Sequence, residues 1–198
     1  FHNPIAVAAD STGVRYVVDW NRNNIRKIDL GDVTSTFAGD GVAGNTASAD
    51  GLGTAAVFAR PYSIAIDADD YLYTTDRLAH TVRVITPAGQ VTTIGSGIGL
   101  SDPIGIEVHP QTGDVYVADY GNGKVRAYQR TIAPVAFTAP PTMTPQTWVA
   151  GGGVDKEGGP AVGKFNNPIG IGCDTLTTDI IVTEYSGRYV NRVSSEGR

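Results

Sequence analysis

The segment PIGIEVHPQTGDVYVADYGNGKVRAY, residues 103–128, contains one complete structural unit. Large apolar residues alternate with other residues, as they do along half-buried strands, in three short runs at 104–108, 115–118 and 124–128. The two connections between these runs are rich in Pro, Gly, Asp and Asn, which favour tight turns. Three strands joined in sequence by tight turns form an antiparallel meander.

The unit occurs four times, and each copy opens on a proline: Pro4, Pro61, Pro103 and Pro168. An apolar strand follows each proline, a second strand ends on a carboxylate, and a third strand opens six residues later. A fourth strand is expected in only three copies, at 33–37, 91–94 and 147–150. This repetition predicts an all-β fold, a β-propeller with about four blades of which the last is incomplete. Residues 1–198 are then a single propeller segment, with approximate repeats at 1–57, 58–99, 100–164 and 165–198.

The recurring residues resemble the NHL repeat. The pattern is Phe-x-x-Pro-x-x-Ile, then Tyr-Val-Ala-Asp, then Asn-x-x-Ile/Val-Arg and Ala-Gly-x-Gly, and it is clearest in Phe1–Gly39 and Pro103–Arg126. Two further copies open at Phe58 and Phe165, so the resemblance covers nearly the whole chain. It implies a five- or six-bladed propeller of the TolB-like type. Members of the family include RNA-binding, protein-binding, sensor-like and amidating-lyase-like propellers, so the resemblance leaves the activity open.

Composition narrows the classes of partner. A net charge of −5 and only four lysines argue against a nucleic-acid surface. No segment has the uninterrupted apolar length of a membrane helix. Cys173 is the single cysteine and is expected to be a buried core residue.

We expect flanking blades or domains in a longer chain, because an incomplete blade leaves an open sheet edge. The compartment stays open, with an extracellular or cell-surface location slightly favoured.

One face of the predicted propeller collects the corners between second and third strands. These corners carry the candidate ligand- or partner-binding residues Asp19, Trp20, Asp76, Arg77, Asp119, Tyr120, Glu184 and Tyr185. The carboxylates also pair in sequence with Arg26, Arg83 and Arg126, which predicts a repeated ion pair across each corner. Aromatic side chains beside charges are typical of recognition surfaces. The Pro-rich insertion at about 130–146 lies on the opposite face and is the competing docking element.

The ends of the first strands offer an alternative site. Asp10, Asp67, His109 and Asp174 recur there once per blade. They head turns, where Asp satisfies backbone N–H groups, so we expect no metal and no cofactor. The alternative is a calcium or zinc ion in the channel, held by Asp67, Glu107, His109 and Asp174.

Small residues occupy one face of the first strands, at Ala6, Ala8, Ser63, Ala65, Gly105, Gly170 and Gly172. This predicts that neighbouring blades approach closely there. Glu107 puts a carboxylate on the same face, and a buried carboxylate needs a partner or a raised pKa. Glu107 is therefore either a channel group or a paired, solvated side chain.

The residues contain no catalytic constellation. The function expected from the sequence is a non-catalytic binding module that presents loops to a protein, peptide or small ligand, and its negative net charge favours a cationic one. The alternative is a metal-assisted propeller enzyme, similar to amidating lyases or lactonases.

Overall fold

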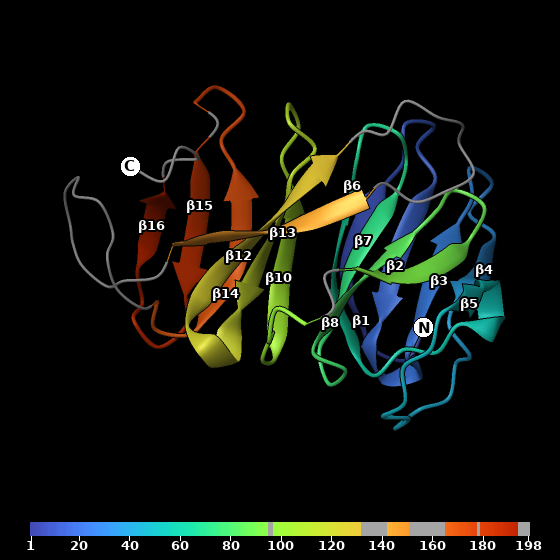
Figure 1. Ribbon diagram of the computed structural model, residues 1–198. Helices are drawn as coiled ribbons and strands as arrows, with labels where there is room; N and C mark the ends of the chain where they lie inside the picture. Colours follow the sequence, from blue (N-terminus) through green and yellow to red (C-terminus); the bar gives the residue numbers. More distant parts are fainter. Residues whose placement is uncertain (95–96, 132–141, 151–164, 178, 194–198) are drawn as a thin grey trace.

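The computed structural model describes residues 1–94, 97–131, 142–150, 165–177 and 179–193. Four antiparallel sheets stand side by side as blades (Figure 1). The predicted all-β propeller architecture is therefore confirmed. Helical structure in these residues is limited to short 3-10 turns, and none of it has the length and apolar character required to cross a membrane.

Each blade is a meander whose strands pair in chain order. The first blade consists of β1 (Pro4–Ala9), β2 (Arg15–Asp19), β3 (Asn24–Ile28) and β4 (Thr34–Ala38). The second consists of β6 (Pro61–Ile66), β7 (Leu72–Asp76), β8 (Thr81–Ile85) and β9 (Gln90–Ile94). The third consists of β10 (Pro103–Val108), β11 (Val115–Asp119), β12 (Lys124–Thr131) and β13 (Thr142–Ala150). In the described residues the fourth has β14 (Pro168–Cys173), β15 (Ile180–Glu184) and β16 (Val190–Val193).

The first strands of the blades line up beside one another. β6 contacts both β1 and β10, and β10 contacts β14. Three apolar layers fill the spaces between successive blades. In each layer one residue of the third strand of the earlier blade is buried completely or almost completely: Ile25 (0% exposed), Val82 (0%) and Val125 (1%). Face-to-face burial of successive sheets is therefore the main source of hydrophobic stabilisation.

A fifth strand, β5 (Gly51–Leu52), pairs with β9 on the outer edge of the second blade. It belongs to the connection 39–60, which we call the strap. The fully buried Arg83 of β8 binds the strap through the carbonyl oxygens of Ala49 (2.8 Å) and Val57 (3.0 Å) and through the carboxylate of Asp50 (2.7 Å). The strap thus covers an edge that a four-stranded meander would leave open. The Pro-rich insertion lies largely outside the described residues, as does most of the connection 151–167.

Candidate functional site

The four carboxylates at the ends of the second strands are buried. Asp19, Asp76, Asp119 and Glu184 are 1%, 0%, 0% and 9% exposed. Each accepts a hydrogen bond from the backbone N–H two residues before the proline of its own blade. The donors are His2 (2.7 Å), Ala59 (2.7 Å), Ser101 (2.8 Å) and Asn166 (2.8 Å). We call this contact the corner clasp, because it ties the entry of each first strand to the end of the second.

The predicted ion pair accompanies the clasp in two blades. Arg126 Nε donates to Asp119 at 2.9 Å, and Arg83 lies 3.4 Å from Asp76. In the last blade Asn191 donates to Glu184 instead. In the first blade, Arg26 lies over the ring of Phe1, with 5.9 Å between the guanidinium carbon and the ring centroid. These carboxylates therefore serve the fold, since burial and internal hydrogen bonds occupy them.

The residues that follow these carboxylates in the corners differ in how much of their side chain is accessible to a partner. Trp20 is half-buried and stacks against the guanidinium of Arg60, 4.9 Å from its ring centroid. Arg77 makes two hydrogen bonds to Asp102, at 2.5 and 2.9 Å. Tyr120 is half-buried, whereas Tyr185 is 68% exposed. Of the predicted recognition residues, Tyr185 thus offers the most accessible surface.

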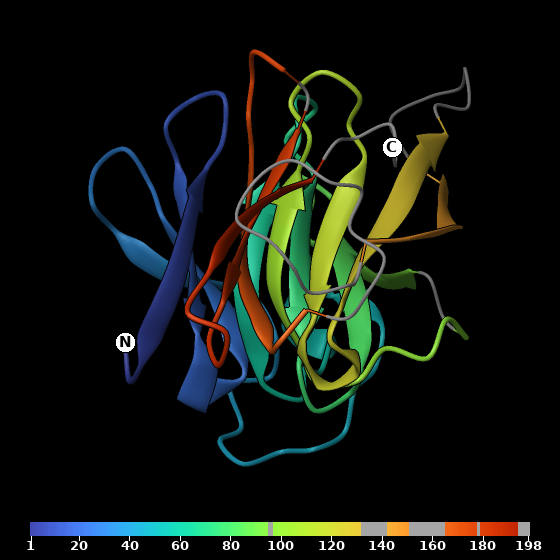
Figure 2. The ribbon, with the colours of Figure 1, turned by 90° about the vertical axis from the view of Figure 1, so that its left-hand side faces the viewer.

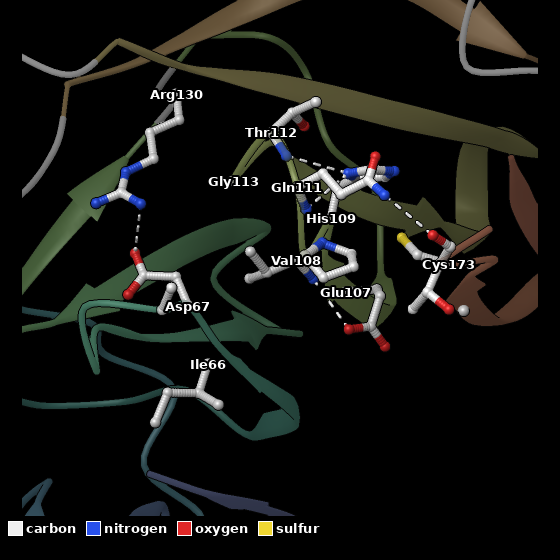
Figure 3. Close-up of a pocket in the computed structure, with 14 residues that line it drawn as sticks. Ile66, Asp67, Glu107, Val108, His109, Gln111, Thr112, Gly113, Arg130 and Cys173 are labelled. Carbon is white, nitrogen blue, oxygen red and sulfur yellow. Dashed lines mark hydrogen bonds and ion pairs between the residues drawn. The ribbon is translucent and has the colours of Figure 1, made fainter. Parts of the chain in front are cut away.

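A cavity of about 640 Å³ opens at the other end of the inner strands (Figure 3). It lies where the second, third and fourth blades turn from their first strands into their second strands. Its polar lining includes Asp67, Glu107, His109, Gln111, Arg130 and Cys173. Three of the four residues in the alternative metal set are therefore lining residues, whereas Asp174 is not. The residues predicted to bind ligands lie at the opposite strand ends and contribute nothing to it.

The predicted turn-heading role accounts for part of this lining. Asp67 Oδ1 accepts the N–H groups of Asp69 (3.0 Å) and Tyr71 (2.9 Å). His109 also heads a turn, and its Nδ1 accepts hydrogen bonds from the N–H groups of Gln111 (3.3 Å) and Thr112 (3.2 Å). Asp10 and Asp174 head their own turns in the same way. The sequence prediction of a turn at each position is confirmed.

Two polar groups among the lining residues lack a full set of partners in the described residues: the carboxylate of Glu107 and the Nε2 atom of His109. Glu107 is half-buried, and its Oε1 accepts a 3.2 Å hydrogen bond from the N–H of Val108. No cation pairs with Glu107 in the part of the chain that the structure describes. Burial raises the pKa of its carboxyl group above the ordinary value of 4.5. His109 is 1% exposed, and its Nε2 is buried with no hydrogen-bond partner among the described residues.

The other charges of the cavity balance one another. Asp67 Oδ2 accepts a hydrogen bond from the Tyr73 hydroxyl (2.9 Å) and lies 3.6 Å from Arg130. Burial, with a smaller contribution from Glu107, raises the pKa of Cys173 to about 12. The Cys173 thiol is therefore protonated at neutral pH and is not a nucleophile. The cavity keeps one uncompensated acidic group, Glu107.

Metal binding can be tested against this geometry. Across the described ranges, no three His, Cys, Asp or Glu side chains form a group that could hold a metal ion. Asp67 is already committed to its turn, to Tyr73 and to Arg130, which leaves Glu107 and the Nε2 atom of His109. Two donors do not complete a calcium or zinc shell. The described residues alone therefore do not complete a site for either ion.

Sequence reasoning missed Arg130 and Gln111. Arg130 lines the cavity and links blades, because it also reaches Asp69 of the second blade. The equivalent positions in the first two repeats are Leu30 and Pro87, so repetition gave no signal for it. Gln111 donates from its side-chain amide to the carbonyl of Thr175 in the fourth blade (3.0 Å).

Comparison with known proteins agrees with the blade pattern. Residues 100–128 match the NHL repeat family. The chain carries an NHL repeat. This matched NHL repeat includes Glu107, His109, Asp119 and Tyr120. No curated protein matches the chain.

Solved structures extend the likeness beyond the NHL repeat. Virginiamycin B lyase from Staphylococcus aureus, solved with quinupristin, has a TM-score of 0.65 at 15% identity, over 99% of this chain and 54% of that one. A gluconolactonase from Xanthomonas campestris has a TM-score of 0.66 at 15% identity, over 97% and 59%. An auxiliary nutrient binding protein from Bacteroides thetaiotaomicron has a TM-score of 0.60 at 15% identity, over 97% and 38%. The chain spans about half the length of the lyase and the lactonase, which are six-bladed propellers. These identities show the fold alone.

Proposed function

We propose that this chain is a non-catalytic binding module, and that its cavity receives a small polar ligand with a cationic group. The observation that carries the proposal is Glu107, a half-buried carboxylate that lines the cavity with no cation beside it in the described residues. Removing a carboxylate from water is costly unless a partner compensates for it. A cationic ligand supplies that partner.

His109 adds a second recognition element. Its Nδ1 accepts two backbone N–H groups, so the proton of the neutral ring resides on Nε2, which becomes a donor. Among the described residues this buried donor has no acceptor, and a hydroxyl or carbonyl oxygen of a ligand that reaches it would supply one. Amino sugars and amino-acid derivatives combine both features. Related use of the fold supports a small ligand, since one similar structure is a nutrient binding protein and another was solved with quinupristin.

Isothermal titration of the purified protein tests the proposal. The probes are two pairs that differ in a cationic group: glucosamine with glucose, and arginine amide with citrulline amide. A charged hydrogen bond contributes about 1.5–3 kcal/mol, so we expect the cationic member of at least one pair to bind about tenfold or more tightly. Glu107→Gln should abolish that preference.

A matched control removes the same charge elsewhere. Asp32→Asn acts on a carboxylate whose side chain is 81% exposed and distant from the cavity lining, so the preference should be unchanged. Equal binding of both members of each pair, or an unchanged preference in Glu107→Gln, would contradict the proposal.

A metal-assisted enzyme is the second candidate. One observation favours it: Asp67, Glu107 and His109 line the same cavity. In that case further ligands would have to come from outside the described residues, because these do not complete a shell. About one calcium or zinc ion per chain in elemental analysis, lost in Glu107→Gln, would favour the enzyme over the binding module.

A further inference from the structure

Arginine occupies the same repeat position in the first three blades, and the structure gives the three guanidinium groups different partners. Each lies on a third strand, seven residues after the carboxylate of its corner clasp: Arg26, Arg83 and Arg126. A guanidinium group has five N–H donors, four of them on Nη1 and Nη2. The acceptors around each arginine therefore show how far its own blade satisfies it.

The strap provides acceptors for both Nη atoms of Arg83. Nη1 donates to the hydroxyl of Ser48 at 2.6 Å. Nη2 donates to the carbonyl of Ala49 (2.8 Å) and to the carboxylate of Asp50 (2.7 Å). A side-chain carboxylate and a main-chain carbonyl thus come to this arginine from one peptide segment.

Arg126 shares the clasp and lacks the other partners. Its Nε donates to Asp119 at 2.9 Å, and neither Nη atom has an acceptor among the described residues. An aromatic partner is missing as well: the ring centroid of Phe58 lies 5.2 Å from the guanidinium carbon of Arg83, and Leu100 takes that repeat position in the third blade. The Arg126 side chain is 16% exposed, and its Nη atoms are accessible to solvent.

The connection that enters the third blade does not replace the strap. Residues 95–101 have the sequence GSGIGLS, which contains no carboxylate, and Asp102 after them pairs with Arg77. Figure 2 shows the strap, in blue to cyan, as a long loop at the lower end of the blades, where the shorter yellow-green connection to the third blade also lies. A Cβ atom on Gly97 or Gly99 would meet nothing within 4 Å, so the surroundings of this connection are open.

We propose that Arg126 is a second binding site of this chain, and that it takes an acidic residue of a peptide segment from a partner protein. The ligand carboxylate accepts parallel hydrogen bonds from Nη1 and Nη2, the geometry that a planar guanidinium favours. The occupant is a peptide because the strap binds Arg83 through a carboxylate and a main-chain carbonyl together. The site is separate from the cavity, whose lining does not include Arg126.

Two short peptides test the site on the folded, purified protein. Ac-Ser-Ala-Asp-Gly-Leu-NH2 has the sequence of strap residues 48–52, and its matched control carries Asn in place of Asp. In NMR titrations we expect the Asp peptide to bind about tenfold or more tightly, because Asn cannot form the charged, bidentate contact. Arg126→Lys keeps a cation beside Asp119 and loses the planar pair of donors, so the preference should fall to about twofold or less. Arg15→Lys, at a side chain that is 40% exposed, should retain it.

Chemical modification tests the same site without a substitution. Phenylglyoxal reacts with accessible guanidinium groups, and mass spectrometry locates the adducts. We expect Arg126 and the exposed Arg22 to react about tenfold or more faster than the fully buried Arg83. The Asp peptide should slow the reaction of Arg126 about fivefold at about four times its Kd, and should leave that of Arg22 unchanged. Equal affinity for the two peptides, an Arg126 that stays reactive in the complex, or equal protection of Arg22 would overturn the proposal.

Discussion

Glu107 stands where the other blades carry Ala8, Ala65 and Gly172. A carboxylate on this inner face is costly to bury and does not stabilise the blade, because its hydrogen bond comes from its own strand, at the N–H of Val108. The role that we propose for Glu107 is in ligand binding and not in the fold. Among the cavity residues, Glu107 is therefore the one whose replacement separates binding from stability.

The raised pKa of Glu107 predicts a pH dependence of stability. Burial disfavours the ionised form in the folded state, so the folded pKa exceeds the ordinary value of 4.5. The stabilising contribution is present below that ordinary value and is lost as the pH rises through the folded pKa. We therefore expect Glu107→Gln to raise the Tm at about pH 8, with the gain disappearing near about pH 4. Thermal melts of both proteins across this range measure it, and a pH-independent difference would contradict it.

Gly105 permits a close approach between the third and fourth blades. A Cβ atom there would lie 2.4 Å from the carbonyl oxygen of Ile169 in β14, whereas one at Gly172 would meet nothing within 4 Å. We expect Gly105→Ala to lower the free energy of unfolding by about 1–3 kcal/mol and Gly172→Ala to leave it nearly unchanged. Denaturant titration compares the two, and similar losses would be inconsistent with this packing. At Gly170 the obstacle is different, since its Cβ would meet the Thr183 hydroxyl of the same blade at 2.6 Å.

At the scale of the element, the corner clasp shows why each blade ends its second strand on a carboxylate. Asp119 accepts hydrogen bonds from the N–H of Ser101 (2.8 Å), from the Asn122 amide (2.8 Å) and from Arg126 (2.9 Å). One side chain thus joins the entry of the first strand, the corner and the third strand. The clasp fixes three elements of a blade with a single buried charge.

Loss of a corner clasp should lower the free energy of unfolding. Asp119→Ala removes three hydrogen bonds and leaves the guanidinium of Arg126, which is 16% exposed, without its partner. We expect the free energy of unfolding to fall by about 3–5 kcal/mol. Asp32→Ala, which breaks an exposed ion pair with Arg15, should cost less than about 1 kcal/mol. Chemical denaturation measures the free energy of unfolding of both variants, and comparable losses would show that the corner clasp contributes little to stability.

The repeated elements could be predicted from the sequence, and the unrepeated ones could not. Strands and corners recur at fixed spacing, so the equivalent repeat positions of Asp76 and Asp119 predict the same role for both residues. β5 is two residues long and depends on Arg83 binding the strap, a long-range contact that no local pattern encodes. The cavity could be predicted only in part. Asp67, Glu107 and His109 of the alternative site line it, whereas Arg130 and Gln111 also reach it although the equivalent positions in other blades carry different residues, such as Leu30 and Pro87 for Arg130. The sequence predicts the aromatic corners as the binding face, whereas the described cavity lies at the other end of the strands.

At the scale of the whole molecule, the described residues cover the second and third blades on both faces and the outer two blades on one face. A charge should therefore have different effects at equivalent positions of the first and third blades. Ile106→Lys, at a residue that is 4% exposed between the second and third blades, should lower the Tm by about 10 °C. Val7→Lys, at a residue that is 63% exposed, should lower the Tm by less than about 2 °C, as should the control Leu30→Lys at a residue that is 70% exposed. Thermal melts compare the three variants, and equal losses in Val7→Lys and Ile106→Lys would contradict this packing.

The corner clasp also has a consequence for how such a protein changes over time. It holds the chain two residues before each proline, which fixes the start of the inner strand at the same place in each blade. The connections leading to Ala59 and to Ser101 differ greatly in length, yet they enter equivalent strands in the same register. We therefore expect the length of such a connection to change while the strand that follows it keeps its register. The strap is constrained further, because it binds the buried Arg83 and pairs with β9, so only its segments outside these contacts are free to vary in sequence.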